Sequence, residues 1–125
     1  MIADDHDALR TAIRNLLESR SGFKVCGEAK NGVQAIERSA EIKPDVVILD
    51  VIMPMMSGFE AARKIKTVSD SRIVMLSAFS DERLLNEAKN VGAVCYVPKS
   101  EAARELIEAV QIAAEGRVSS MFHRA

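Results

Sequence analysis

The sequence predicts an α/β domain built on one doubly wound parallel sheet of five strands. Five short apolar runs alternate with five segments of helical periodicity, and residues that favour turns lie between them. The length of 125 residues suits a single domain, and 48% hydrophobic residues suffice for a buried core. Strict alternation of strand and helix favours a parallel sheet with helices on both faces, because crossover connections are right-handed.

The strands are recognised as short runs of branched or aliphatic residues. The third run, at residues 46–49, has four such residues in succession, which is typical of a strand with both faces buried. The first is very short. The predicted strands are Met1–Ala3, Phe23–Glu28, Val46–Leu49, Ile73–Leu76 and Ala93–Val97.

The helices are recognised as apolar stripes with a spacing of three or four residues. Glycines near the ends of these segments mark their boundaries. In chain order, the predicted stripes are Leu9, Ile13, Leu16 and Leu17; Val33, Ile36 and Ala40; Phe59, Ala62 and Ile65; Leu84, Leu85, Ala88 and Val91; and Leu106, Ile107 and Val110.

Five such units suit the flavodoxin-like strand order 2-1-3-4-5. This (βα)5 order puts the first strand beside the third at a switch point, where ligands bind beyond the strand ends. It also puts Cys26 and Cys95 on opposite edges of the sheet, too far apart for a disulfide. The two cysteines lack metal-ligand spacing, so we expect them to be small buried apolar residues.

Composition excludes several classes of function. The formal charge is -1 and no basic block is present, so direct binding of this chain to nucleic acid or anionic lipid is not expected. No apolar run is long enough for a membrane span, and the N-terminus lacks a signal-peptide core. We therefore expect a cytoplasmic protein without membrane contact.

Polar residues converge at the carboxyl ends of the predicted strands. Asp4 and Asp5 close the first strand, Asp50 the third and Ser77 the fourth, and Lys99 follows the fifth. Three carboxylates in one partly desolvated crevice would repel one another, so the arrangement needs a cation or a proton. Ligands that are all oxygen, with no histidine or cysteine besides, favour a hard divalent ion, Mg²⁺, for which Mn²⁺ could substitute.

This set of groups suits phosphoryl transfer. Asp50 would attack phosphorus as a nucleophile, while the metal and Lys99 take up charge on the phosphoryl oxygens and the Ser77 hydroxyl donates to one of them. Taken singly, each residue has a plainer explanation: a strand-terminal aspartate is usually a turn former, and a loop lysine is usually solvated. Their convergence on one edge is what favours a site.

Four motifs together resemble the receiver domain of two-component response regulators. They are Asp4-Asp5-His6, the run 46–54 (VVILDVIMP) with Gly58, Ser77-Ala78, and the run 96–99 (YVPK). The resemblance covers essentially the whole chain. The Asp-Asp-His opening and the Lys99-Ser100 pair also resemble the subfamily that carries a LuxR-type helix-turn-helix output domain.

The resemblance implies a role for each matching residue. Asp50 would accept a phosphoryl group from a sensor histidine kinase. Asp5, Asp50 and the Ile52 carbonyl would hold Mg²⁺, with Asp4 acting through water, and Lys99 and Ser77 would contact the phosphoryl group.

Further expectations concern the response to phosphorylation. Ser77 and Tyr96 would form a switch pair that remodels the face made by helix 4, strand 5 and helix 5. Phosphorylation would then favour a homodimer. Such a domain is not an enzyme, beyond taking phosphoryl groups from small donors and losing them slowly.

Ile52 lies two residues past Asp50 and Phe79 two residues past Ser77, and they resemble the variable positions that line the approach of hydrolytic water in receiver domains. Both are bulky and apolar and neither can orient water, so we expect slow self-dephosphorylation.

Some features depart from the family pattern. Ser100 stands where many receivers have a proline after the lysine, so a trans Lys99–Ser100 bond is expected. The short first strand suggests lost N-terminal residues and puts its pairing in doubt. Residues 1–115 would form the receiver domain and residues 116–125 a C-terminal tail or the start of a linker. The output domain, which would bind DNA to regulate transcription, is missing from this sequence; alternatively, the protein is a stand-alone receiver that acts through protein–protein interaction.

Three other functions fit the sequence less well. A phosphoaspartate hydrolase of the haloacid dehalogenase type wants a second aspartate two residues after the nucleophile, where this chain has Ile52. A flavin carrier of the same fold needs a small-residue phosphate loop after strand 1, and the acids there would repel a phosphate. A non-phosphorylated interaction module would be expected to lack an acid or the lysine, and none is missing.

Overall fold

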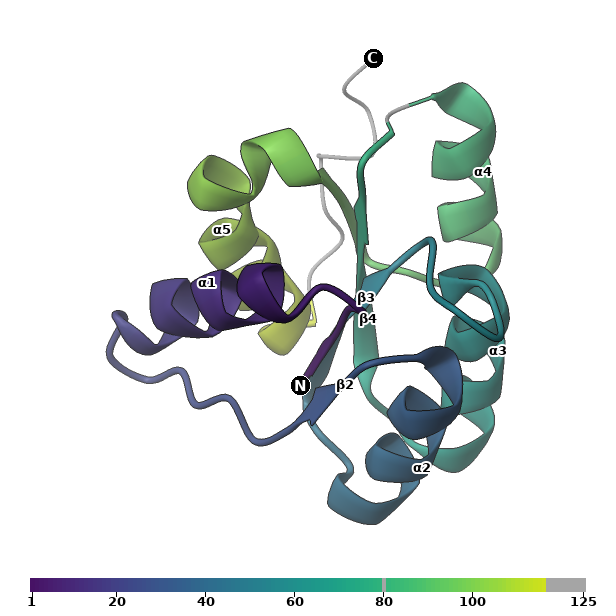
Figure 1. Ribbon diagram of the computed structural model, residues 1–125, viewed down its shortest axis with the longest axis horizontal. Helices are drawn as coiled ribbons and strands as arrows, with labels where there is room; N and C mark the ends of the chain where they lie inside the picture. Colours follow the sequence, from purple (N-terminus) through teal and green to yellow (C-terminus); the bar gives the residue numbers. More distant parts are fainter. Residues whose placement is uncertain (80, 117–125) are drawn as a thin grey trace.

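The computed structural model describes residues 1–79 and 81–116, which form one five-stranded parallel sheet with helices on both faces (Figure 1). The strand order is β2-β1-β3-β4-β5, as predicted. The strands are β1 (Ile2–Ala3), β2 (Glu28–Ala29), β3 (Val46–Asp50), β4 (Arg72–Ser77) and β5 (Cys95–Pro98). The helices are α1 (Asp7–Glu18), α2 (Gly32–Ile42), α3 (Gly58–Val68), α4 (Glu82–Asn90) and α5 (Ala102–Ala114), with a 3₁₀ turn, η1 (Lys99–Glu101), before α5.

The short first strand pairs on both sides. Ile2 lies opposite Glu28 of β2 and opposite Ile48 of β3, so β1 occupies the predicted place beside β3 despite its length. All five residues of β3 are buried, in keeping with the continuous apolar run. The end of β1 and the end of β3 therefore lie side by side at one edge of the sheet.

The second strand differs from the prediction. Residues 23–27 are not assigned to a strand, and β2 contains only Glu28 and Ala29. The register explains the difference: with Ile2 opposite Glu28, residues 23–26 would need partners before Met1. Cys26 in this segment is exposed, so the prediction that both cysteines are buried is wrong for Cys26 and confirmed for Cys95.

The helices form two layers, one on each face of the sheet. Figure 1 shows α1 and α5 on one side and α2, α3 and α4 on the other. Two apolar clusters fill the layers, one containing Ile13, Leu17 and Leu106 under α1 and α5, the other containing Phe59 and Ile65 under α3. Side-chain caps begin α2, α3 and α4, where Asn31, Ser57 and Asp81 accept hydrogen bonds from backbone N–H groups three residues on.

The stripe predicted for the second helix is rotated. The buried face of α2 consists of Gly32, Ala35 and Ser39. Ala40 is exposed, and Ile36 is only partly buried. Small residues let α2 approach α3 closely, and sequence periodicity built on large apolar residues missed them. The other predicted stripes contribute buried or partly buried residues to the two clusters.

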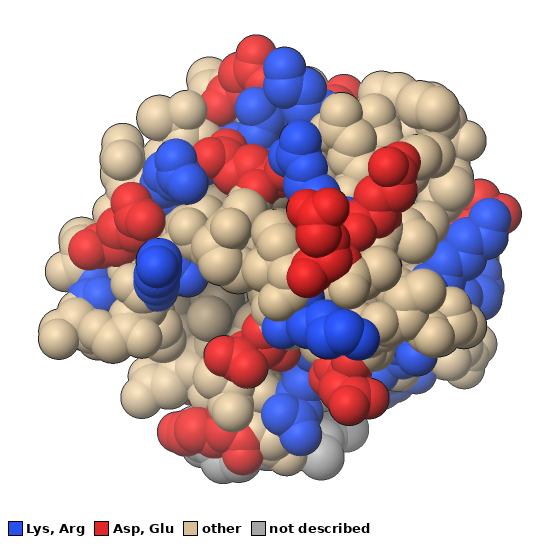
Figure 2. All heavy atoms as spheres, turned by 90° about the horizontal axis from the view of Figure 1, so that it is seen from below, with Lys and Arg blue, Asp and Glu red and all other residues tan. Residues whose placement is uncertain are grey.

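Other global features agree with the sequence. The described residues contain no cis peptide bond, so Lys99–Ser100 is trans as expected. Within residues 1–79 and 81–116, no helix combines the length and hydropathy of a membrane span. Figure 2 shows acidic and basic side chains interspersed over one face of the molecule. Residues 117–125 of the predicted tail or linker lie outside the described residues.

Candidate functional site

The three predicted carboxylates meet at the carboxyl ends of β1 and β3. Asp4 and Asp5 directly follow β1, and Asp50 is the last residue of β3. One ligand atom from each of Asp4, Asp5, His6 and Asp50 lies within 4.8 Å of all the others. Asp4 and Asp50 are almost completely buried, whereas the Asp5 side chain is 31% exposed.

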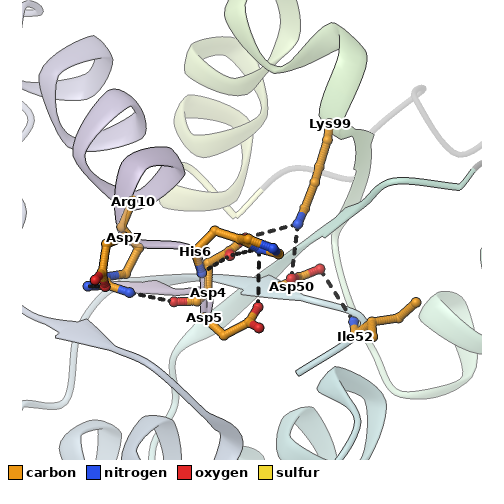
Figure 3. Close-up of polar contacts among 8 residues, drawn as sticks. All are labelled: Asp4, Asp5, His6, Asp7, Arg10, Asp50, Ile52 and Lys99. Atoms are coloured by element: carbon orange, nitrogen blue, oxygen red, sulfur yellow. Dashed lines mark hydrogen bonds and ion pairs between the residues drawn. The ribbon is translucent and has the colours of Figure 1, made fainter. Parts of the chain in front are cut away.

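Lys99 reaches this acidic cluster from the far side (Figure 3). It begins the turn after β5, and its Nζ atom donates a hydrogen bond to Oδ2 of Asp50 at 3.0 Å. The same Nζ lies 3.2 Å from Oδ2 of Asp4. One ammonium therefore contacts two buried carboxylates. Burial lowers the pKa of Lys99, but the contacts with Asp50 and Asp4 and the Asp50 charge outweigh this effect and raise the pKa.

Burial raises the pKa of Asp50 to about 6, helped by the nearby Asp4 charge and opposed by the Lys99 hydrogen bond. The Ile52 N–H also donates to Oδ1 of Asp50 at 3.3 Å, which favours the charged form. A carboxylate in this position carries charge that its surroundings only partly compensate.

The donor set fits a hard divalent cation. Asp5 Oδ1 and Asp4 Oδ2 are buried oxygens that accept no hydrogen bond from the described residues, although Lys99 lies near the latter. Burying an oxygen without a hydrogen-bond donor is costly, and a divalent cation would supply a partner for both oxygens in addition to Lys99. Oxygen donors of this kind suit Mg²⁺.

His6, the third residue of the Asp4-Asp5-His6 motif, lies beside the acids and faces solvent. Its side chain is 67% exposed, yet Nδ1 is 3.2 Å from Asp4 Oδ1 and 3.3 Å from Asp5 Oδ1. Its backbone N–H donates to Asp4 Oδ1 at 2.8 Å, which holds that carboxylate in place. An imidazole is a poor ligand for a hard cation, so the carboxylates rather than His6 are the groups that could hold one.

Ser77 ends β4, and Tyr96 lies within β5, the next strand of the sheet. Ser77 follows Leu76, the partner of Asp50 in β4, and its buried hydroxyl accepts the Phe79 N–H at 3.0 Å. The ring of Tyr96 is buried, and its hydroxyl donates a short hydrogen bond to the Phe79 carbonyl. The loop after β4 is therefore tied at Phe79 to both predicted switch residues.

The loop after β3 is shaped by one close backbone approach. Gly58 begins α3, and its N–H donates to the Val51 carbonyl at 2.7 Å. A Cβ atom at Gly58 would lie 2.0 Å from the Asp50 carbonyl oxygen, so only glycine fits there. This contact fixes the backbone of Asp50.

The structure also brings in residues that the sequence analysis did not single out. Arg10 of α1 is buried and contacts Glu28, Asp7 and the carbonyl of Asp4. The sequence contained a signal that Arg10 is buried, because it lies three residues before Ile13 and seven before Leu17 on the buried face of α1. A cation on a buried helical stripe needs partners, and here it finds them beside the acids.

A comparison with known protein families matches residues 1–111 to the response regulator receiver domain. Among curated proteins, the transcriptional regulatory protein YdfI of Bacillus subtilis is 33% identical over 118 residues, which cover 94% of this chain and 55% of YdfI. The chain spans about half the length of the curated relatives it matches.

Solved structures with a similar fold also belong to response regulators. A LuxR-family two-component response regulator from Aurantimonas has a TM-score of 0.91 at 32% identity, covering 97% of this chain and 87% of that one. The signal receiver domain of a NarL response regulator from Mycobacterium tuberculosis has a TM-score of 0.88 at 30% identity, covering 93% and 94%.

Proposed function

Because the chain belongs to the response regulator receiver domain family, we propose that Asp50 accepts a phosphoryl group from a sensor histidine kinase. The observation that carries this proposal is the environment of Asp50. Its buried carboxylate ends β3, accepts a hydrogen bond from Lys99 and has Asp4 and Asp5 oxygens within 4.8 Å. No other aspartate of the described residues combines these features.

The transfer forms one bond and breaks one. A carboxylate oxygen of Asp50 attacks phosphorus, and the phosphorus–nitrogen bond to the kinase histidine breaks, leaving its electron pair on the imidazole. The reaction requires Asp50 to be ionised, which its pKa of about 6 permits at neutral pH. Lys99 is placed to move from the carboxylate to a phosphoryl oxygen, since its ammonium already lies 3.0 Å from Oδ2.

We assign the cation to Asp5, Asp50 and the Ile52 carbonyl, with Asp4 contributing through water. Mg²⁺ held there would offset the repulsion among the carboxylates and the phosphoryl oxygens. Asp5 is the most accessible of the three acids, and its Oδ1 accepts no hydrogen bond within the described part of the chain. Mn²⁺, which also prefers oxygen ligands, would substitute.

The signal would leave the site through Ser77 and Tyr96. Phosphorylation adds negative charge and strong acceptors, and Ser77 would turn its hydroxyl from the Phe79 N–H to a phosphoryl oxygen. The Tyr96 hydroxyl already contacts the Phe79 carbonyl, so a shift of this loop would change the position of Tyr96. The affected surface is the face of α4, β5 and α5, and we infer that it controls homodimer formation.

The output is proposed from the relatives. Their names describe transcriptional regulators, and they extend well beyond the part that this chain matches. A DNA-binding output domain controlled by this receiver would accordingly regulate transcription, while this chain itself would not contact DNA. The receiver is a signalling domain, and its own chemistry would be limited to accepting a phosphoryl group and slowly losing it.

The direct test is to incubate the chain with acetyl phosphate and Mg²⁺ and measure its mass. The wild-type chain should gain one phosphoryl group, and the Asp50→Asn variant none. Asp70→Asn, which changes an exposed aspartate, is the matched control and should be labelled like the wild type. An unlabelled wild type, or equal labelling of Asp50→Asn, would contradict the proposal.

A further inference from the structure

Arg10 carries a buried guanidinium that joins three segments of the chain. Its side chain is only 9% exposed. Nε donates to Glu28 Oε1 of β2 at 3.0 Å, Nη1 to the Asp4 carbonyl at 2.8 Å, and Nη2 to Asp7 Oδ1 at 2.6 Å. Figure 3 shows the guanidinium lying beside the turn that carries the acids.

Packing alone does not account for this residue. The neighbouring core positions of α1 are Ile13 and Leu17, and an apolar side chain at position 10 would continue that stripe. Burying a charge is costly unless it is paired and hydrogen-bonded, and a buried pair often stabilises no more than apolar residues of similar volume. The contact of Arg10 with the Asp4 carbonyl is the feature that an apolar residue could not supply.

That contact fixes the peptide unit between Asp4 and Asp5. The Asp4 N–H donates to the Ala29 carbonyl at 3.0 Å, and the Asp4 carbonyl accepts from Arg10. These two bonds hold the peptide units on either side of Asp4, so the backbone direction at Asp5 is set, and with it the direction of the Asp5 carboxylate. This carboxylate makes no side-chain contact to Arg10 itself.

We propose that Arg10, held by Glu28, is a positioning residue that orients the Asp4–Asp5 peptide and thereby aims the Asp5 carboxylate at the divalent cation. The inference rests on the proposed function of the acidic cluster as a cation site. Glu28 acts by anchoring the guanidinium: it lies in β2, which pairs with β1, so the anchor moves with the strand that ends in the acids.

Arg14 provides a matched control. It lies one turn further along α1, and its Nη1 is 3.1 Å from the second oxygen of Glu28, Oε2. Within the described part of the chain, it shares the Glu28 anchor but forms no hydrogen bond or ion pair with Asp4. Arg10→Met and Arg14→Met thus each remove one cation beside Glu28, and only Arg10→Met removes the hydrogen bond to the Asp4 carbonyl.

Two measurements separate positioning from folding. The first is the backbone amide nitrogen shift of Asp5 without metal, because this amide shares its peptide unit with the Asp4 carbonyl. The second is the Mg²⁺ dissociation constant by calorimetry, without a phosphoryl donor. Arg10→Met should move the Asp5 resonance and weaken Mg²⁺ binding about ten-fold, as loss of a supporting hydrogen bond at a metal site does. Arg14→Met should change Mg²⁺ binding less than two-fold.

Arg10→Lys keeps the charge without the planar fork of donors. It should not restore Mg²⁺ affinity, because an ammonium cannot serve the separate acceptors in the same geometry. If Arg10→Met does not fold, Arg10→Lys and Glu28→Gln carry the test, with Glu28→Gln expected to weaken Mg²⁺ binding less than Arg10→Lys does.

The inference is overturned if a folded Arg10 variant keeps the wild-type Asp5 resonance and Mg²⁺ affinity, or if Arg14→Met changes both to the same extent. A wild-type chain that binds Mg²⁺ and is phosphorylated would leave the proposed function standing in that case. A wild-type chain that binds no Mg²⁺ would instead overturn the proposed cation site, and the positioning role with it.

Discussion

The Lys99 ammonium donates a hydrogen bond to the Asp50 carboxylate at 3.0 Å across the carboxyl ends of β3 and β5. β4 lies between these two strands, so the contact spans the middle of the sheet edge. It brings together the proposed phosphoacceptor and its nearest positive charge before any phosphoryl group arrives. The energetic consequences of this pair can be measured.

Lys99→Met should destabilise the chain at neutral pH. Removing one partner leaves Asp4 and Asp50 buried and uncompensated, and breaking a buried pair costs about 3–5 kcal/mol in general. Lys99 is 19% exposed, so we expect about 2 kcal/mol in urea unfolding at pH 7.5. The loss should shrink at pH 5, where Asp50 binds a proton. An equal loss at both pH values would contradict the assignment.

Asp50→Asn should stabilise the metal-free chain at neutral pH. The folded-state pKa of Asp50 is raised to about 6 from 3.8, chiefly by burial. The folded state therefore binds the proton more tightly than the unfolded state. The stability that the protonated Asp50 carboxyl contributes is therefore fully present below about pH 4 and is lost as pH rises through about 6. The full shift corresponds to about 3 kcal/mol.

The measurement is the free energy of unfolding from pH 4 to pH 7.5 in EDTA. The wild type should lose stability relative to Asp50→Asn over this interval, and Mg²⁺ should recover part of the loss for the wild type alone. If the free energies of unfolding of the two chains changed in parallel with pH, burial of the charged Asp50 carboxylate would not be the cause of the lost stability.

Gly58→Ala should disrupt the site through the backbone. A Cβ there would lie 2.0 Å from the Asp50 carbonyl oxygen and 2.9 Å from Val51 Cα, and neither backbone atom can move without shifting β3. We expect a loss of stability of more than about 2 kcal/mol and reduced labelling by acetyl phosphate. Gly27→Ala is the control, because its Cβ would meet side chains rather than backbone: the flexible end of Ile42 at 2.9 Å and the Met1 side chain at 3.7 Å.

Met55→Gly should stabilise the chain. Met55 has φ of 76°, where side chains are strained, and its side chain is 76% exposed, so it contributes little packing. Relief of the left-handed strain is worth about 1–2 kcal/mol and is partly offset by the greater entropy of unfolded glycine. A net gain of about 0.5–1 kcal/mol is expected in urea unfolding. Met55→Ala keeps the strain and should show no gain.

Much of this structure could be predicted from residue pattern. The buried run of β3 and the alternation of elements led to the strand order, and the strand-end acids led to the cluster with Lys99. Local patterns failed where tertiary partners decide. The strand predicted at 23–28 is shorter in the structure because β1 offers too few pairing partners. The predicted stripe of the second helix was misplaced because the buried face of α2 is made of small residues. Arg10 was missed because its role depends on what lies across from it in β2.

The proposed site makes a final prediction about the lifetime of the phosphoryl group. Ile52 and Phe79 are 60% and 57% exposed, and they stand two residues beyond Asp50 and Ser77. Neither side chain can hydrogen-bond to water, so neither can orient a water molecule for attack on phosphorus. We therefore expect the phosphorylated chain in Mg²⁺ to lose its label over minutes or longer rather than seconds.

Ile52→Asn supplies a side-chain amide that can hold water at this position. It should speed dephosphorylation about ten-fold, which is less than a positioned general base provides. Met55→Asn is the matched control: it replaces another exposed apolar side chain of the same loop, three residues further from the acids. Decay is followed by mass measurement after removal of acetyl phosphate. Equal rates for the two variants would show that polarity near the site, rather than the position of Ile52, controls hydrolysis. Loss of the wild-type label within seconds would contradict the role assigned to both apolar residues.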